Sequence, residues 1–348
     1  GVQTCALPIL SDLEYTINTS GTFTLRSGNS NYTVDWGDGS SLETSTSTVL
    51  SHTYSSAGTY VVKININSNS RYGPNYNNNA DGDEIISIAV SSFTTSTPVT
   101  SLYRSLKGSQ NMTKYNQVAA ATSAVTTFFE AWAGTGLSSF PLIDTSSGTN
   151  FHGSWSGCSG ITTFPLIDTS SGTNFQSTWN GCSGITTFPQ LDTSSGTSFK
   201  DTWKNCSGLT TFPQLDTSSG TNFDGSWKSC SGLTTFPVLD TSSGTNFADA
   251  WSSCSGLTTF PALNVSSGTD FNNTWGNCSG LTSFPLIDVS NGTNFFYTWR
   301  GCTGLTTFPQ LDTSSGTNFA NAWNGCTGLT TFPQLDTSSG TNFDNAWR

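Results

Sequence analysis

A block of 24 residues recurs through the second half of this chain, and no other feature of the sequence restricts its fold as strongly. The block reads L-T-T-F-P-x-L-D-T-S-S-G-T-N-F-x-x-x-W-x-x-C-S-G. Its Phe-Pro pair begins at Phe140, Phe164, Phe188, Phe212, Phe236, Phe260, Phe284, Phe308 and Phe332. A fixed period of this length is typical of solenoids and similar arrays. The sequence therefore predicts stacked coils that present an extended binding or structural surface.

The composition supports a folded, non-nucleic-acid-binding chain. Only 9% of the 348 residues are charged, which is typical of disordered chains when Gly, Ser, Thr and Asn are abundant, but 11 Trp and 23 Phe can form a core. A formal net charge of -11 leaves no basic stripe to neutralise phosphates, so nucleic acid and anionic membrane surfaces are excluded as partners. The sequence contains no run of 18 apolar residues, so it predicts no membrane-spanning helix.

Each coil is expected to contain one short helix. Its apolar residues recur at i, i+4 and i+7, as in Phe223, Trp227 and Cys230, and this spacing places them on one helical stripe. Asn222 is suited to cap the start of that helix, and Gly232 to end it.

The segment L-T-T-F-P-x-L, residues 209–215 in one coil, predicts a short edge strand or an extended segment because it is rich in β-branched and aromatic residues. Pro213 cannot donate a ladder hydrogen bond, so regular pairing should stop near it. Asp-Thr-Ser-Ser-Gly then makes a turn. One coil buries too little apolar surface to fold alone, so coils should stack about 4.8 Å apart, with Phe on Phe, Trp on Trp and Asp on Asp.

Short runs of alternating polar and apolar residues predict a small antiparallel β-sandwich near the N-terminus. The runs are residues 14–18, 22–26, 31–36 and 59–65. Within them, VDWGDGS at 34–40 followed by SHTYSSAGTYVVKI at 51–64 resembles the polycystic-kidney-disease-type (PKD-like) domain family. That resemblance implies an immunoglobulin-like sandwich built around the W-G-D-G turn.

The repeat is similar to the surface-protein repeat of BspA-like leucine-rich-repeat proteins of bacteria. The positions that correspond to the family pattern are Leu233, Pro237, Leu239, Asp240, Thr241, Ser242, Trp251, Cys254 and Leu257. The chain departs from the family at Phe247, Trp251 and Gly244, where Met, Phe and an aliphatic residue are usual. The larger rings opposite the glycine keep the packed volume similar. The resemblance implies a surface-exposed or secreted protein that binds cells, host matrix or glycans.

The predicted fold class is thus a β-sandwich followed by an α/β leucine-rich-repeat-like solenoid. Gly1 to Ile9 resemble a translated sequencing adapter and are expected to be non-native, and the last repeat stops before its Cys, so we expect a fragment. The expected organisation is the adapter-derived segment 1–9, the PKD-like sandwich 10–66, an Asn/Asp-rich linker 67–84, degenerate capping repeats 85–136 and the solenoid 137–348.

Two ladders of repeated polar residues carry alternative interpretations. The aspartates, interrupted by Asn264, could bind cations or could hold their own turns by accepting backbone N–H groups; asparagine can do only the second, which favours the turn. The cysteines of the repeat could form disulfides, but stacked Cβ vectors run parallel, which favours buried reduced thiols.

Two places are candidate sites. The oxygen spacing of Asn77, Asn79, Asp81 and Asp83 resembles half of a calcium loop, with an Asn-rich linker as the alternative; no other cofactor is expected. The variable positions of each coil should face solvent, and Phe296, Tyr297 and Arg300 form the strongest candidate ligand site among them.

No catalytic constellation is recognisable, so we expect a non-enzyme. The favoured function is a cell-surface or secreted bacterial adhesion or recognition protein that binds a surface protein or glycan without inserting into the membrane. The alternatives are a structural spacer or virion-associated phage fibre component, and the binding arm of a larger secreted hydrolase.

Overall fold

The computed structural model describes residues 13–19, 21–26, 32–47, 49–66, 85–90, 101–102, 104–117 and 122–347. They belong to two compact units, Gly1–Gly148 and Thr149–Arg348, and each unit is described by itself. All regular elements in the described residues are β-strands. None of these residues forms a helix that is long and apolar enough to span a bilayer.

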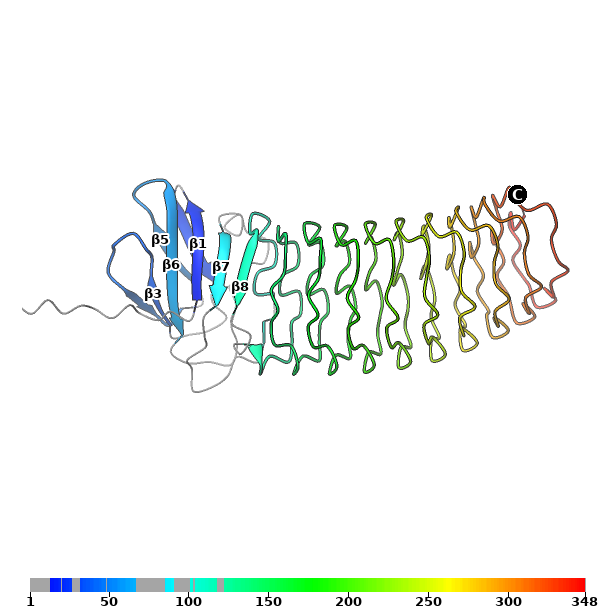
Figure 1. Cartoon of the computed structure of the whole chain (residues 1–348), viewed down its shortest axis with the longest axis horizontal. Coiled ribbons are helices and arrows are strands. Elements are labelled where there is room, and N and C mark those ends of the chain that lie inside the picture. The colour runs from blue at the N-terminus through cyan, green and yellow to red at the C-terminus, as the bar shows by residue number, and fades with distance from the viewer. Residues whose placement is uncertain are drawn as a thin grey trace, which may run out of the picture. The chain divides into compact units, whose positions relative to one another are not determined.

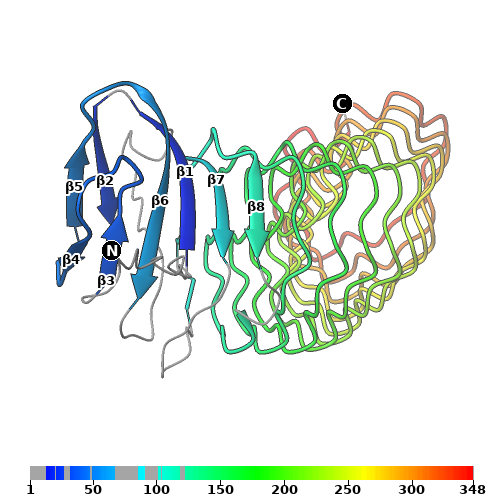
Figure 2. The same cartoon turned by 60° about the vertical axis from the view of Figure 1, so that its left-hand side comes forward.

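The described part of the first unit forms two sheets, which Figures 1 and 2 show from two sides. The larger sheet has the strand order β4-β3-β6-β1-β7-β8, and the smaller pairs β2 with β5. The strands are β1 (Leu13–Thr19), β2 (Thr22–Arg26), β3 (Tyr32–Asp35), β4 (Glu43–Ser45), β5 (Val49–Thr53), β6 (Gly58–Ile66), β7 (Ile85–Val90) and β8 (Lys114–Gln117).

Alternating side chains explain why these segments form half-buried strands. In β1, Tyr15, Ile17 and Thr19 are buried, while Asn18 between the last two is exposed, as the two-residue period of a strand requires. The four runs expected from the sequence correspond to β1, β2, β3 and β6, so those predictions are confirmed. The N-terminal part is therefore a strand-rich sheet domain of the expected immunoglobulin-like kind.

The sheet extends beyond the four expected strands. β7 pairs antiparallel with β1, and β8 pairs parallel with β7 through Ile88 and Tyr115. Tyr115 is buried against Trp132 and Phe140, with ring centroids 5.5 Å and 5.8 Å away. Burial, and to a lesser extent nearby Tyr15 of β1, raises the pKa of Tyr115. One core therefore continues from the N-terminal sheet into the first aromatic rings of the repeats.

The second unit is a series of 24-residue coils joined by backbone contacts, visible as the row of loops from green to red in Figure 1. Isolated parallel bridges link each coil to the next, from Asn150↔Asn174 to Asn318↔Asn342. The expected short strand is wrong in this unit, because pairing is limited to single bridges such as Thr163↔Thr187. The proline that follows two residues later has no N–H to continue a ladder.

The expected helix is also wrong. Between Phe175 and Cys182 the chain makes successive β-turns, in which Thr178 N donates to Phe175 O and Cys182 N donates to Trp179 O, at 3.1 Å each. Each of these two turns has a positive φ at its third residue, 55° at Ser177 and 77° at Gly181, as type II turns require. A right-handed helix cannot contain such residues in every turn.

The turns are stabilised by hydrogen bonds between coils. The N–H groups of Phe175, Ser177, Trp179 and Gly181 donate to carbonyls of the next coil at 2.7–3.0 Å. The intervening N–H groups donate within their own coil. Alternate N–H groups therefore point to the neighbouring coil. The two turns bring the side chains of Phe175, Trp179 and Cys182 to the interior. Their sequence spacing of four and three residues thus does not require a helix.

Aromatic rings form continuous ladders inside the second unit. Neighbouring ladder tryptophans, from Trp155 to Trp347, lie 5.3–5.9 Å apart with ring planes within 9° of parallel. The phenylalanines from Phe151 to Phe343 stack in the same way at 5.3–5.7 Å. Trp227 has no exposed surface, whereas Trp347, which has a coil on one side only, is 52% exposed. The predicted stacking of like rings is confirmed, and each coil completes the burial of its neighbour.

One glycine of the repeat is required by the rings. A Cβ on Gly244 would lie 2.5 Å from Cζ of Phe247 in the same coil and 3.0 Å from the ring of Phe223 in the preceding coil. The large rings occupy the space that an aliphatic side chain at position 244 would take. This agrees with the prediction that larger rings opposite the glycine keep the packed volume similar.

Candidate functional site

The variable residues of each coil lie along one edge of the second unit, which we call the turn edge and define as the six residues after each ladder phenylalanine, such as 176–181. Its second residue has a positive φ, between 51° and 64°, in every coil. These residues are Gly153, Ser177, Asp201, Gly225, Asp249, Asn273, Tyr297, Asn321 and Asn345. Eight of them are residue types that tolerate a left-handed backbone or bond locally to it, and Tyr297 is the exception.

The structure brings together the three residues of the candidate ligand site. The ring centroids of Phe296 and Tyr297 lie 3.9 Å apart at an interplanar angle of 48°. The guanidinium carbon of Arg300 lies 4.8 Å from the centroid of Tyr297, which is within cation–π distance. Both rings are half-buried and Arg300 is exposed. We call these residues the aromatic–arginine cluster; whether they bind a ligand remains a prediction.

Neighbouring coils place short, uncharged residues beside the aromatic–arginine cluster. Backbone hydrogen bonds join Asn273 N to Phe296 O at 2.7 Å and Gly301 N to Asn324 O at 2.8 Å. The residues equivalent to the cluster are Asn272, Asn273 and Gly276 in the preceding coil and Ala320, Asn321 and Asn324 in the following coil. The cluster is thus flanked by carboxamides rather than by carboxylates or long side chains.

The lysines of the turn edge, in contrast, are neutralised by aspartates. Lys200 Nζ lies 2.7 Å from Asp224, Lys204 Nζ lies 3.0 Å from Asp201, and Lys228 Nζ lies 3.1 Å from Asp249. Two of these pairs join neighbouring coils. They are part-exposed pairs, which typically contribute less than about 1 kcal/mol each. Their role here is to leave little free charge along that stretch of the edge.

The aspartate ladder forms turns, as the favoured interpretation predicts. Oδ1 of Asp240 accepts the backbone N–H of Ser242 at 3.0 Å and its hydroxyl at 2.7 Å. These hydrogen bonds from Ser242 lower the pKa of Asp240. Asn264 makes the same two bonds with Ser266, so the turn does not need a charge. No cluster of three potential metal-ligating side chains occurs among the described residues.

The cysteines of the repeat are free thiols, which confirms the favoured interpretation. From Cys182 to Cys326, each Sγ donates to the carbonyl of the tryptophan 27 residues earlier, at 3.0–3.1 Å. Burial raises the pKa of Cys206 and Cys254 to about 12. These thiols are therefore structural groups rather than nucleophiles.

The calcium candidates Asn77, Asn79, Asp81 and Asp83 lie outside the described residues, so the calcium prediction stays untested.

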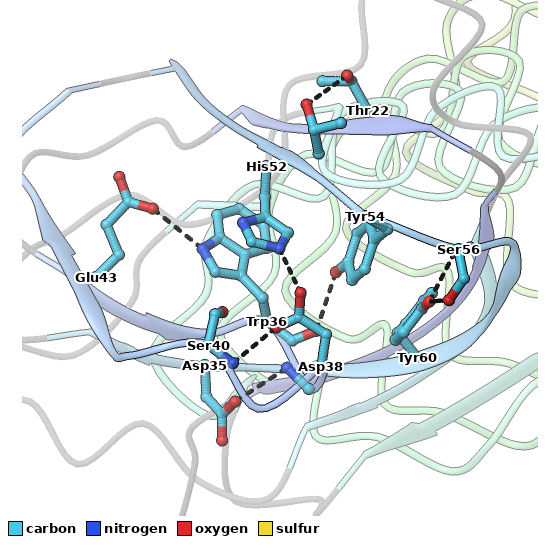
Figure 3. A network of polar contacts seen from close by, with 12 residues as sticks. Thr22, Asp35, Trp36, Asp38, Ser40, Glu43, His52, Tyr54, Ser56 and Tyr60 are labelled. Atoms are coloured by element: carbon cyan, nitrogen blue, oxygen red, sulfur yellow. Dashed lines mark hydrogen bonds and ion pairs between the residues drawn. The ribbon is translucent and has the colours of Figure 1, made fainter.

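The W-G-D-G turn is a structural network in the first unit, drawn in Figure 3. His52 Nε2 lies 2.7 Å from Asp38 Oδ2, and the His52 ring stacks on Trp36 at 4.9 Å. Trp36 Nε1 donates to Glu43, and the Tyr54 hydroxyl donates to the carbonyl of Trp36. Hydrogen bonds from Ser40 and His52 hold the pKa of the Asp38 carboxyl well below its ordinary value. Every polar group of the motif serves the fold of the turn.

Sequence reasoning found the aromatic–arginine cluster but missed the backbone strain at Tyr297. A signal for it exists, since the equivalent position holds only Gly, Ser, Asp or Asn in the other coils of the second unit. That composition is typical of a left-handed turn position rather than of a helix.

Comparison with known proteins identifies one module. No curated protein and no solved structure matched the chain. The BspA-like resemblance of the repeat therefore stays a prediction. Residues 12–70, which span β1 to β6, match the family model of the PKD domain. Together with the strand-rich sheet and the W-G-D-G network, this match shows that the chain carries a PKD domain at its N-terminus.

Proposed function

We propose that this protein is a non-enzymatic, surface-exposed or secreted recognition protein that binds its ligand through the aromatic–arginine cluster. PKD domains are typical of extracellular or surface proteins. In this proposal the 24-residue coils form a solenoid related to BspA-like surface repeats, with turns in place of the helix. The solenoid holds the cluster on a rigid edge, and the ligand is a glycan or a protein on a host or neighbouring cell.

The observation that carries the proposal is the conformation of Tyr297. A non-glycine residue in the left-handed region costs about 1 kcal/mol or more, and residues in such sparsely populated conformations cluster at functional sites. Tyr297 carries this cost beside a second aromatic ring and an arginine. Tyr and Arg are also the residue types enriched at binding hot spots.

The proposed absence of catalysis is supported by the state of the reactive side chains. The repeat cysteines are buried and hydrogen-bonded, and the ladder aspartates accept hydrogen bonds from their own turns. His52 is packed between aromatic rings and paired with Asp38. None of these groups has the arrangement of nucleophile, base and orienting group that acyl or glycosyl transfer needs.

A binding array of glycans and extracellular matrix proteins tests the proposal. The variant F296A/Y297N/R300N gives this coil the residues of the next one, namely Ala320, Asn321 and Asn324, so its fold should be retained. The control Q176A/S177N produces the same residues in another coil, where Asn180 already stands.

We expect a ligand of the unmodified chain to lose at least tenfold in affinity with the cluster variant and to bind the control variant normally. If the chain binds nothing on the array, or if both variants bind alike, the cluster is not a recognition site. The spacer or fibre function would then be favoured.

A further inference from the structure

Unlike the three lysines of the second unit, Arg300 has no carboxylate partner among the described residues. Lys200, Lys204 and Lys228 each contact an aspartate. Arg300 contacts the face of Tyr297 instead. A guanidinium that contacts a ring face can still donate its N–H groups to an anion, and Arg300 is exposed to solvent.

The neighbouring coils leave this charge uncompensated. The three equivalent residues on either side of the aromatic–arginine cluster are asparagine, glycine or alanine. Asp249, the nearest acidic turn-edge residue before the cluster, lies two coils earlier and already contacts Lys228 and Asn273. Arg300 is thus a local positive charge on a chain whose net charge is -11, and this charge is complementary to an anion.

The aromatic rings define the rest of the ligand. Phe296 and Tyr297 offer half-buried ring surface, and the apolar C–H face of a sugar ring can cover it and exclude water. Asn272, Asn321 and Asn324 have carboxamides, which both donate and accept hydrogen bonds and therefore suit a ligand rich in hydroxyl groups. An acidic peptide could use Arg300 but offers fewer hydroxyl groups to these amides.

We infer that the aromatic–arginine cluster binds an acidic sugar, whose ring packs on Phe296 and Tyr297 and whose carboxylate or sulfate accepts paired hydrogen bonds from Arg300. This inference rests on the proposed recognition function and names its ligand class. The planar fork of arginine matches both anions in a two-point contact, which lysine cannot make.

Four probes test the ligand class against the whole chain at about 0.15 M salt, where long-range repulsion by the acidic protein is screened beyond about 8 Å. They are hyaluronan oligosaccharide (carboxylate), dextran sulfate (sulfate), dextran (neutral) and poly-glutamate (acidic peptide). We expect at least one acidic glycan to bind tenfold or more tightly than dextran and poly-glutamate. The same glycan should lose at least tenfold in affinity with R300N and with F296A/Y297N, and part of that with R300K, while Q176A/S177N binds normally.

The outcomes separate the ligand class from the function itself. Equal binding of dextran or poly-glutamate, or acidic binding that R300N leaves unchanged, overturns the acidic-sugar inference. Absence of binding to all four probes also overturns this inference. The recognition function still stands in that case if the array yields a ligand whose binding is abolished in F296A/Y297N/R300N. Absence of any array ligand defeats both.

Discussion

Tyr297 occupies a backbone conformation that the other coils of the second unit leave to Gly, Ser, Asp or Asn. A single side chain therefore opposes the local preference of its own turn. Replacing it with asparagine should relieve strain and remove binding at once, which is the trade-off expected where a site is maintained at the expense of stability.

We predict that Y297N raises the stability of the chain by about 0.5–1 kcal/mol, because asparagine tolerates a positive φ. The shift is measured as the change in urea midpoint monitored by tryptophan fluorescence. N321Y, the reverse change at the same turn position of the next coil, should lower stability by a similar amount. If the two variants shift the midpoint in the same direction, the conformation of Tyr297 is not strained.

We predict that G244A destabilises the chain by about 1–3 kcal/mol, the usual effect of overpacking a core. The added methyl group would lie 2.5 Å from Cζ of Phe247 and 3.0 Å from the ring of Phe223. The neighbouring Ser243 is exposed, so S243A should change stability by less than about 0.5 kcal/mol. Thermal unfolding followed by near-ultraviolet circular dichroism distinguishes the two, and equal effects would show that the glycine is not required.

At the scale of elements, each coil is a chain of turns held by its neighbours. The 24-residue period and the stacking of like rings could be predicted from the sequence, because spacing determines which residues become equivalent. The helix could not be excluded by the spacing of Phe223, Trp227 and Cys230, since two successive four-residue turns return side chains to one side just as a helix does. What distinguishes the turns from a helix is the residue type at the second position after each ladder phenylalanine, which is almost always Gly, Ser, Asp or Asn.

Asn222 illustrates how correct local chemistry led to the wrong element. It was expected to cap a helix, and its Oδ1 does accept the N–H of Asp224 at 3.0 Å. The same hydrogen bond begins an Asx turn. Because both elements begin with that bond, only the residues that follow decide between them.

The aspartate turns predict how the coils respond to acid. Hydrogen bonds from serine lower the pKa of Asp192, Asp240 and Asp288 below the ordinary value of 3.8. Their contribution to stability is present above pH 3.8 and is lost as the pH falls through the lower pKa of the folded state. We therefore expect the melting temperature of the unmodified chain to fall below about pH 4.

D192N/D240N/D288N should show a smaller fall in melting temperature between pH 6 and pH 3, because asparagine keeps the turn, as Asn264 does, and does not titrate. Circular dichroism melts at both pH values measure the difference. An equal fall in the variant and the unmodified chain would mean that these carboxylates do not contribute to the acid response.

At the scale of the whole molecule, the PKD domain is part of the sheet that leads into the repeats. β7 and β8 follow β1 in that sheet, and Tyr115 of β8 packs on Trp132 and Phe140. The sequence analysis assigned these strands to degenerate capping repeats, and β8 does pair with β7, which lies about one repeat earlier. The pairing of β7 with β1 could not be predicted, since nothing in a short segment such as 85–90 indicates a partner strand far away in the chain.

We predict that a chain beginning at residue 85 aggregates, because removal of β1 leaves the long edge of β7 without hydrogen-bond partners. Light scattering and size-exclusion chromatography of equal concentrations of the shortened and full chains measure this. An internal deletion of one whole coil, residues 199–222, keeps the N-terminal sheet and should stay soluble. Monomeric behaviour of the shortened chain would show that the PKD domain does not protect the repeats.

The row of thiols has a consequence for how such a protein could be made. Each cysteine from Cys182 to Cys326 donates its hydrogen to a tryptophan carbonyl in the preceding coil, and none is joined to another. A chain exported through a membrane would then reach its final form without oxidants or disulfide isomerases. Because these coils repeat the same hydrogen bond from thiol to tryptophan carbonyl, duplication or loss of a coil in the gene would leave no cysteine without its partner. Variants of different length could therefore mature equally well.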